Sequence, residues 1–548
     1  MNSLNRRDFL GASLAGVTGY SLVVDARGES APPDFAATPS AASAPETGAP
    51  VEGRGACDCH MSLEELDCDV FIAGGGMSGV CAAISAARHG AKVVLVQDRS
   101  RLGGNASSEI GMHIVGANSH NGRPGWREGG LMEELRLDDA VHNPHRAFEL
   151  WDLLLYDKCV SEPNLRLLLD TSVCAAEVSG GRLTTAIARC DKTETLYRVK
   201  ASIYCDCTGD SRLALEAGAD LRSGRESQDE FMEPLAPLQG DTLTQGSSIL
   251  FTARKHDRPM PFVAPSWARR ITEKNLKFRG IPRSSFEYGY WWIELGGMYD
   301  TIKDNERLRY ELLRVVLGVW DWIKNSGKRP DSANWALQKV GMIPGKRESR
   351  RVMGPHVQSE NELMGGWKQR DDGVAIGGWG FDDHPPGGFD DWDNRPYNST
   401  PVPEVYNIAF DALYSRNISN LMMAGRNISN THVASTSTRV MATCACMGQA
   451  VGTAAALAAR YRLDPGQLRR QKIRELQQTL LRDDQSIRLV TNEDAADVAR
   501  KARVTASAVH ENAEPAHVIN GVTRDMPGKW DNRWAALMSS GEPWIELR

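Results

Sequence analysis

The sequence predicts an α/β fold built around a dinucleotide-binding βαβ unit, and three consecutive segments indicate this unit. An apolar segment at residues 69–73 leads directly into the glycine pattern Gly74-x-Gly76-x-x-Gly79. Small residues then continue to Gly90, as in a tightly packed helix, and residues 92–97 form a second apolar segment typical of a strand. In such a unit the first glycine makes the tight turn, the second lets the backbone approach a pyrophosphate, and the third packs helix against strand. We therefore expect cofactor contacts at Gly74, Gly76, Met77, Ser78 and Gly79.

The residue that closes the second strand departs from the usual pattern. An acidic side chain ordinarily binds the adenosine ribose at this position, whereas here Gln97 occupies it and Asp98 follows. A glutamine carbonyl can accept a ribose hydroxyl, and Asp98 can do the same one residue later. Both side chains remain candidates for the ribose contact.

Length and composition limit what the rest of the chain can be. At 548 residues it is too long for one simple core, so at least two domains are expected. A hydrophobic content of 41% and a charged content of 24% are those of an ordinary globular protein. The net charge of −6, without a Lys/Arg-rich run, argues against a nucleic-acid partner. No apolar run of about 20 residues stands out, so we expect no membrane span.

The first 26 residues have the pattern of an export signal. Arg6 and Arg7 are followed by Phe-Leu and a small, apolar stretch at residues 11–24, which predicts a twin-arginine signal peptide at residues 1–26. The alternative is a disordered basic start. Residues 27–65, rich in Ala, Pro, Ser and Gly, predict a flexible linker. Because the twin-arginine pathway exports folded proteins, a periplasmic or extracellular location is expected.

The eleven cysteines do not have the spacing of a metal site. Three pairs are spaced C-x-C, and no C-x-x-C pair occurs, so neither an iron–sulfur cluster nor a zinc ribbon is supported. The Cys57-Asp-Cys59-His60 segment lies in the predicted linker, and we assign it no metal. Cys205 and Cys207 are expected in a strand, and Cys444 and Cys446 in a buried helix, as small buried residues.

A resemblance to a known family begins at residues 96–109. This segment, which contains Arg101-Leu-Gly-Gly-Asn-Ala-Ser-Ser-Glu109, resembles a loop of bacterial FAD-dependent oxidoreductases in the glutathione-reductase-like superfamily. The group is sometimes labelled xanthan lyase and is placed near the flavin subunit of heterodisulfide reductase. The resemblance implies that the chain passes the pyrophosphate at Gly103 and Gly104, and runs beneath the isoalloxazine at Asn105, Ala106 and Ser107.

Two later segments continue the same resemblance. Residues 203–210 end in Thr-Gly-Asp, and residues 420–456 are similar to the closing flavin motif of the family. In the superfamily, the helix within this last motif directs its N-terminus at the flavin pyrimidine, where its dipole stabilises negative charge. The resemblance implies non-covalent FAD and contacts at Thr208, Gly209, Asp210, Gly425, Arg426, Met441, Ala442 and Thr443.

The predicted fold is thus α/β, with a Rossmann-type FAD-binding domain (GR2-like) split between residues 66–224 and 418–465. Residues 225–417 are expected to form an inserted α+β substrate domain. A helical extension follows at residues 466–501, with a helix at 467–481 and Asn492 capping another. Residues 502–548 resemble the opening part of a discoidin-like β-sandwich.

The predicted inserted domain contains nine of the fourteen tryptophans and a helix at residues 304–324. Asp304 is expected to cap this helix, and Leu308, Leu312, Val315, Val319 and Ile323 to form its apolar face. The tryptophans either stack on sugar rings or fill the core. Arg347, Arg350 and Arg351 either order an anionic substrate or the flavin edge, or pair with nearby carboxylates such as Glu348. The Asp-rich loop at residues 381–393 could line a cleft, but its spacing does not predict calcium.

For catalysis the resemblance implies hydride transfer at flavin N5, with the protein supplying orientation and a proton-transfer group. His432 is the first candidate for that group and His113 the second; a buried structural role is the alternative for His432. Arg439 is expected to bind substrate oxygens, the flavin pyrimidine or a phosphate. The expected function is an exported oxidoreductase with a sugar- or polyol-like substrate and an unidentified electron acceptor. The alternatives are an electron-transfer flavoprotein and a non-catalytic carbohydrate-binding protein on a degenerate flavin fold.

Overall fold

The computed structural model describes residues 60–117, 127–282, 285–287, 290, 292–522 and 532–548. The predicted signal peptide, most of the predicted linker, Cys57 and Cys59 lie outside these residues. The first strand, β1 (Ser62–Ala73), begins four residues inside the predicted linker.

A central sheet organises the main body. Its order is β3-β2-β1-β6-β5-β4, and β17 also pairs with β6. Strands β3, β2, β1, β6 and β17 run parallel, whereas β4 and β5 extend the sheet antiparallel from β6. The C-terminal ends of the parallel strands therefore meet at one edge, which is where ligands bind in open α/β sheets. The other strands of this sheet are β2 (Val93–Val96), β3 (Leu165–Leu168), β4 (Ser172–Ser179), β5 (Arg182–Cys190), β6 (Thr195–Asp206) and β17 (Leu421–Met423).

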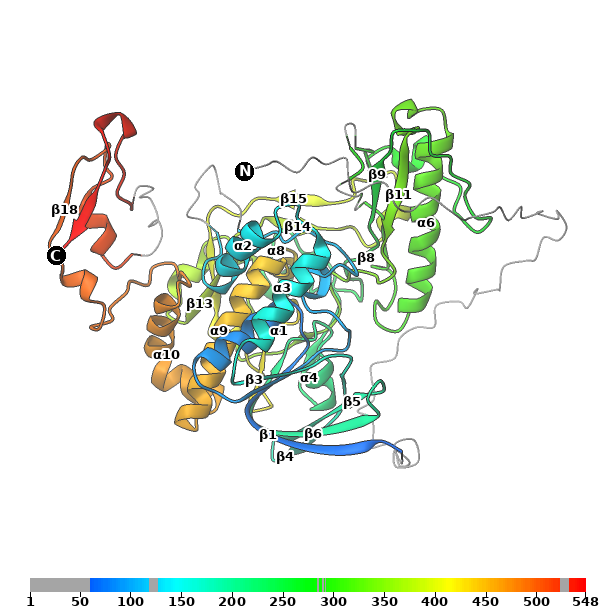
Figure 1. Cartoon of the computed structure of the whole chain (residues 1–548). Helices are drawn as coiled ribbons and strands as arrows, with labels where there is room; N and C mark the ends of the chain where they lie inside the picture. The colour runs from blue at the N-terminus through cyan, green and yellow to red at the C-terminus, as the bar shows by residue number, and fades with distance from the viewer. Residues whose placement is uncertain (1–59, 118–126, 283–284, 288–289, 291, 523–531) are drawn as a thin grey trace, which may run out of the picture. The chain divides into compact units, whose positions relative to one another are not determined.

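Helices α1 (Met77–Arg88) and α9 (Met441–Tyr461) lie side by side (Figure 1). Small residues allow their backbones to approach, because a Cβ on Gly448 would lie 2.1 Å from Ser78 O and one on Gly452 would lie 2.1 Å from Ala82 O. Among the described helices, α9 is long and apolar enough to cross a membrane, but 94% of its most apolar window is buried inside the protein. It is therefore a core helix of this fold.

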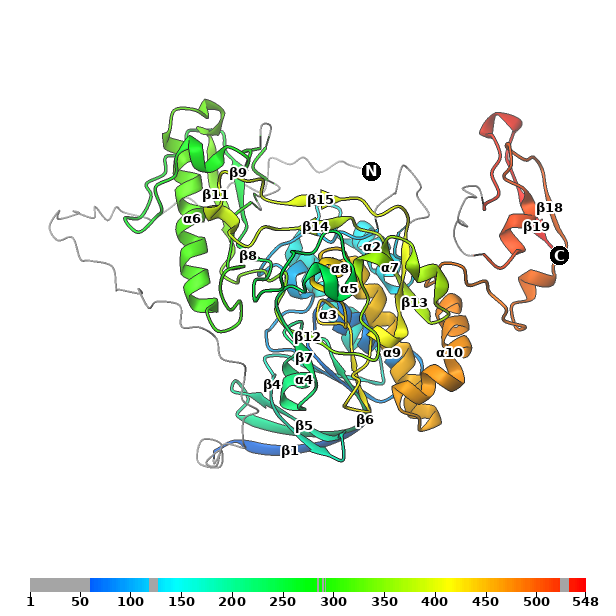
Figure 2. The ribbon, with the colours of Figure 1, turned by 180° about the vertical axis from the view of Figure 1, so that it is seen from behind.

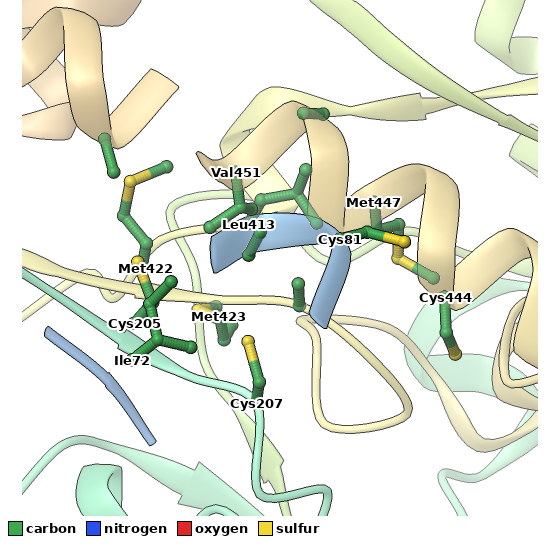
Figure 3. Packing of buried hydrophobic residues seen from close by; sticks show 14 of the residues in the cluster. Ile72, Cys81, Cys205, Cys207, Leu413, Met422, Met423, Cys444, Met447 and Val451 are labelled. Carbon is green, nitrogen blue, oxygen red and sulfur yellow. The ribbon is translucent and has the colours of Figure 1, made fainter. Parts of the chain in front are cut away.

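The main core lies between these two helices and the sheet. Figure 3 shows Cys81 of α1 and Met447 and Val451 of α9 in the same buried cluster as Met422 and Met423 of β17. The predicted buried cysteines belong to this core: Cys205 and Cys446 are 0% and 1% exposed, and Cys207 and Cys444 are 5% and 7% exposed. Burial raises the pKa of the Cys444 thiol to about 12, so these groups pack as small apolar residues.

A second core confirms the predicted helix in the middle of the chain. Helix α6 (Asn305–Asn325) packs beside β9 (Phe251–Lys255) and β11 (Trp335–Val340) (Figures 1 and 2). Asp304 occupies the N-cap position, but its side chain makes no cap hydrogen bond to the helix. The five residues predicted for the apolar face, Leu308, Leu312, Val315, Val319 and Ile323, are all buried, and so are Trp320 and Trp335.

The second core is smaller than the predicted inserted domain. Its buried residues lie between Ile249 and Trp335, together with Phe389, whereas Val352, Trp367 and most of the buried hydrophobic residues of 374–418 belong to the main core. Strand β12 (Arg351–Val352) pairs with β7 (Leu221–Arg222), and thereby joins the predicted insert to the first part of the FAD domain. The remaining strands of this region are β8 (Ser247–Ser248), β10 (Glu294–Leu295), β13 (Gly373–Gly377), β14 (Phe381–Asp383), β15 (Asn398–Thr400) and β16 (Tyr406–Ala409).

The C-terminal region agrees with the prediction in one helix and differs in another. Helix α10 (Pro465–Arg482) covers the predicted 467–481. No α-helix follows Asn492 among the described residues; its side chain instead donates to Asp497, and the next helical segment is a 3-10 turn at Val498–Lys501. Strands β18 (Val504–Ala506) and β19 (Ile545–Leu547) pair antiparallel. The other helices are α2 (Leu131–His142), α3 (Phe148–Val160), α4 (Arg212–Glu216), α5 (Gln228–Phe231), α7 (Glu360–Leu363) and α8 (His432–Thr438).

Candidate active site

The glycine motif forms a cradle at the C-terminal edge of the sheet. Gly74 has φ +95°, and a Cβ there would lie 2.6 Å from Cys207 O. A Cβ on Gly79 would lie 1.8 Å from Gly74 O, so this glycine lets α1 pack against the turn. A Cβ on Gly76, by contrast, would meet no protein atom within 4 Å. The space above Gly76 is therefore open to a ligand at the N-terminus of α1.

One cavity of about 1160 Å³ begins at this cradle. Most of the predicted cofactor contacts line it: Gly74, Gly76, Met77, Ser78, Gln97, Asp98, Gly103, Gly104, Asn105, Thr208, Gly209, Asp210, Gly425, Arg426 and Met441. Motifs far apart in the sequence thus meet around one space, because β1, β2, β6 and β17 all end at the same edge.

The other predicted contacts do not line the cavity: Gly79, Ala106, Ser107, Ala442 and Thr443. The Ser107 hydroxyl donates to Gly104 O at 2.8 Å, and the Thr443 hydroxyl donates to Glu128 Oε1 at 2.7 Å. These side chains therefore hold neighbouring segments in place.

Gln97 already has hydrogen-bond partners within the protein. Its Oε1 accepts from Gly75 N at 2.8 Å, and its Nε2 donates to Arg101 O at 3.1 Å. It thus ties the glycine turn to the second glycine loop. The Asp98 carboxylate is 63% exposed, lines the cavity and lies 3.8 Å from Arg99 Nε. Asp98 is therefore the better placed of the two ribose candidates.

Asp210 anchors two cationic side chains at the cavity wall. Its carboxylate pairs with Lys346 Nζ and Arg426 Nη2, each at 2.6 Å, and accepts from the Ser349 hydroxyl at 2.8 Å. Burial would raise the pKa of Asp210, but Arg426 and Lys346 hold it well below its usual range. Asp210 therefore fixes the segments that carry Lys346 and Arg426, and Lys346 is a lining residue that the sequence prediction did not include.

His432 does not line the cavity. It is 4% exposed, its Nδ1 lies 2.9 Å from Glu348 Oε2, and its Nε2 lies 3.5 Å from Asp383 Oδ1. Burial alone would lower the pKa of His432, but Glu348 and Asp383 raise it to about 9. Because His432 is held by two carboxylates and does not line the cavity, it corresponds to the structural alternative rather than to a substrate base.

The other two predicted catalytic residues do line the cavity. The His113 ring lies 5.7 Å from the Phe148 ring, centre to centre. Arg439 is 11% exposed, and its Nη2 donates to Asp382 O at 3.0 Å and lies 3.3 Å from Asp382 Oδ2. Arg439 thus joins the start of α9 to β14.

The prediction did not include His384, which lies in the same wall of the cavity. Its Nδ1 lies 2.7 Å from Glu294 Oε2, and its Nε2 lies 3.1 Å from Asp382 Oδ2. Burial would raise the pKa of Asp382, but His384 and Arg439 hold it well below its usual range. His384 falls in the Asp-rich loop that the sequence marked as a cleft lining, so the signal was present without identifying the residue.

Aromatic side chains complete this end of the cavity. The Trp292 and Tyr397 rings are parallel within 1° and lie 5.3 Å apart, and both line the cavity together with Trp379. The two interpretations of the tryptophans therefore apply to different residues: Trp320 and Trp335 fill the core, whereas Trp292 and Trp379 face the cavity.

Positive charge predominates in the cavity lining although the whole chain carries a net charge of −6. The lining cations are Arg99, Arg212, Lys346, Arg347, Arg350, Arg426 and Arg439, and the lining carboxylates are Asp98, Asp210 and Asp382. Such a lining attracts anions. Among the described residues, no group of three or more His, Cys, Asp or Glu is placed to hold a metal ion.

A Rossmann-type sheet with a glycine cradle and a long cavity at its C-terminal edge defines a dinucleotide-binding protein. The chain belongs to the FAD dependent oxidoreductase family, whose model matches residues 69–480. The protein is therefore an FAD-dependent oxidoreductase, as the resemblance implied. No curated protein matches the sequence significantly.

The solved structures that match this chain include three proteins of low sequence identity. A geranylgeranyl bacteriochlorophyll reductase-like protein from Thermoplasma acidophilum is 12% identical over 77% of this chain and 86% of that chain, with a TM-score of 0.35. The myxobacterial chondrochloren halogenase is 11% identical over 75% and 79%, with a TM-score of 0.37. A variant of Escherichia coli quinol fumarate reductase is 12% identical over 76% and 75%, with a TM-score of 0.30. At these identities and TM-scores the three matches support no statement about function.

The residues present fit FAD. The open space at Gly76 and the N-terminus of α1 suit a pyrophosphate, and Gly104 brings a second backbone segment to the same place, since a Cβ there would lie 3.2 Å from Gly76 Cα. Arg212, Arg350 and Arg426 add cationic groups to the same lining.

Proposed function

We propose that this protein is an exported FAD-dependent oxidoreductase that moves two electrons between flavin and a hydroxylated, carbohydrate-related small molecule. One observation carries the proposal: a single cavity runs from the glycine cradle to a wall formed by Trp292, Tyr397, His384, Asp382 and Arg439. Cofactor and substrate chemistry would therefore share one space.

Bound FAD supplies hydride transfer, and this chain supplies the substrate's position and its proton. An alcohol that becomes a carbonyl gives up a hydride, with both electrons, to the flavin and a hydroxyl proton to the protein. The pair His384–Asp382 lines the cavity, and its 3.1 Å contact allows a proton to be shared. We therefore assign proton transfer to this pair in place of His432, with His113 as the second candidate.

The stacked rings of Trp292 and Tyr397 support a substrate with a carbohydrate ring, because aromatic faces pack on the apolar faces of sugars. Arg439 and Asp382 then offer a donor and an acceptor for hydroxyl groups. We call this part of the cavity, lined by Trp292, Asp382, His384, Tyr397 and Arg439, the substrate end.

Anaerobic mixing of the yellow holoprotein with a panel of sugars, polyols and sugar acids tests the function. Bleaching of the flavin band by a hydroxylated compound is the expected result. If a thiol or reduced ferredoxin bleaches the flavin and no hydroxylated compound does, the electron-transfer alternative replaces this proposal. A purified protein that binds no flavin but retains a carbohydrate would support the non-catalytic alternative.

Export rests on Arg6 and Arg7 in the sequence. Replacing both with lysine should leave the folded, yellow protein in the cytoplasm, as measured by cell fractionation and flavin fluorescence, with a cytoplasmic marker enzyme as the control. Unchanged export of the double variant would refute the twin-arginine route.

A further inference from the structure

Around the substrate end, the cavity is lined by two arginines, Arg347 and Arg439, and by one carboxylate, Asp382. Both ring nitrogens of His384 face carboxylate oxygens, Glu294 Oε2 at 2.7 Å and Asp382 Oδ2 at 3.1 Å. Arg347 lies 3.4 Å from the same Glu294 oxygen, and Arg439 lies 3.3 Å from the same Asp382 oxygen. His384, Arg347 and Arg439 thus share two carboxylates, and neither carboxylate pairs with Arg439 alone.

Arg439 differs from Arg347 in having a buried donor without a partner. Arg347 uses its Nη1 to donate to Gly246 O at 3.1 Å and to the Ser248 hydroxyl at 2.9 Å. The hydrogen bonds of Arg439 within the described chain come from Nη2 alone, and its Nε is buried without a partner. A buried donor that lacks a partner is costly, and because Arg439 lines the cavity, an anionic acceptor there would stabilise the site.

A carboxylate is the anion that this place suits. A guanidinium presents a planar fork of donors that matches two carboxylate oxygens. A carboxylate also brings only one negative charge beside Asp382, whereas a phosphate would bring almost two. The neighbouring wall, formed by Trp292 and Tyr397, accepts a flat or ring-shaped organic group better than it accepts a second anion.

We propose that the substrate carries a carboxylate that binds Arg439, so that the enzyme acts on a hydroxy acid, such as a sugar acid, rather than on a neutral sugar. The inference rests on the proposed function and narrows its substrate class. The carboxylate would hold the molecule beside the His384–Asp382 pair, where its hydroxyl proton can leave.

The test compares matched compounds that differ in the carboxylate: D-glucose with D-glucuronate, glycerol with glycerate, and 1,2-propanediol with lactate. Binding to the holoprotein is followed by perturbation of the flavin absorption spectrum and by the melting temperature. At least one acid should bind, and each acid that binds should bind at least about 10-fold tighter than its neutral partner. Arg439→Gln should weaken that acid by about 10- to 100-fold, as expected for hydrogen bonds to a charged group, and Arg439→Lys should recover part of the loss.

Arg269→Gln is the matched control, because Arg269 pairs with Asp390 and does not line the cavity. It should leave acid binding unchanged, and flavin content reports whether each variant is folded. The inference fails if no acid binds, if neutral partners bind equally well, or if Arg439→Gln changes only the flavin reduction potential. Flavin bleaching separates the two proposals. If neutral sugars bleach the flavin as well as their acids do, the requirement for a carboxylate is refuted and the proposed oxidation of a hydroxylated substrate stands. If an acid binds but no compound bleaches the flavin, the proposed oxidation is refuted and the carboxylate site stands.

Discussion

The sharpest prediction compares two glycines of the same motif. Gly76 leaves space for FAD, whereas Gly79 leaves space for the protein's own backbone. Gly76→Ala places a methyl group where no protein atom lies within 4 Å, and Gly76 has φ −66°, which any residue adopts. Its folding cost is the exchange of glycine for alanine at a helix N-cap, about 1 kcal/mol. Gly79→Ala instead places a methyl group 1.8 Å from Gly74 O. That overlap cannot be relieved by a side-chain rotation, so the cost is several-fold greater, about 3 kcal/mol or more.

Two measurements on the purified variants distinguish the cases. The melting temperature of the flavin-free protein should fall by no more than about 4 °C for Gly76→Ala, and much further, or with loss of soluble protein, for Gly79→Ala. The ratio of 450 nm to 280 nm absorbance after gel filtration should show that Gly76→Ala binds FAD at least about 10-fold more weakly, a loss of 1.4 kcal/mol. A Gly76→Ala protein that keeps its flavin at wild-type affinity would refute the cradle, and equal thermal behaviour of the two variants would refute the packing argument.

Two further predictions concern the histidines. The His384→Gln variant should retain FAD, but a hydroxylated substrate should reduce its flavin about 10²- to 10⁴-fold more slowly than in the wild type. In the His432→Gln variant the rate of flavin reduction should stay close to wild type. Stopped-flow bleaching measures both rates, and a slow His432→Gln variant with a normal His384→Gln variant would return the proton-transfer role to His432. The folded-state pKa of His432 is raised from 6.5 to about 9, so its contribution is fully present below pH 6.5 and is lost as pH rises through 9. Urea unfolding between pH 6 and pH 10 should therefore show a decline of at most about 3 kcal/mol that His432→Gln removes, and an equal decline in the variant would contradict the assignment.

Features determined by short stretches of sequence could be predicted from the sequence. The glycine turn depends on residues 74–79 and two flanking strands, and the helix at residues 305–325 depends on its own periodicity. The helix is correct to within one residue at each end, and the turn lies between the two predicted strands, although β1 begins at Ser62, seven residues before the predicted apolar segment. The extent of the middle domain could not be predicted in this way. Residues 374–418 can pack on the first or the second core, and the choice depends on long-range contacts that the local sequence pattern does not contain.

The side chains that share ion pairs illustrate the same limit within the site. Asp210 was expected to contact the cofactor because it ends a recognisable turn, yet its partners are 136 and 216 residues away in the sequence. Lys346 and Arg426 reach Asp210 only because the fold places their segments, which follow residues 343 and 423, next to the end of β6. A motif can therefore identify where a carboxylate lies without revealing whether it is already paired with cationic side chains of the protein.

The exchange of His432 for His384 follows from this limit. In the fold both histidines lie beside aspartates, whereas the sequence favoured His432 because it lies between two flavin motifs. In the fold, α8 packs against β14, and Asp382 and Asp383 are consecutive residues of that strand, so their side chains leave it on opposite faces. Asp383 meets buried His432, whereas Asp382 meets His384 and Arg439 in the cavity wall. The alternation of side chains along one short strand therefore decides which histidine can reach a substrate. The paired kinetic test of His384→Gln and His432→Gln also tests the register of that strand.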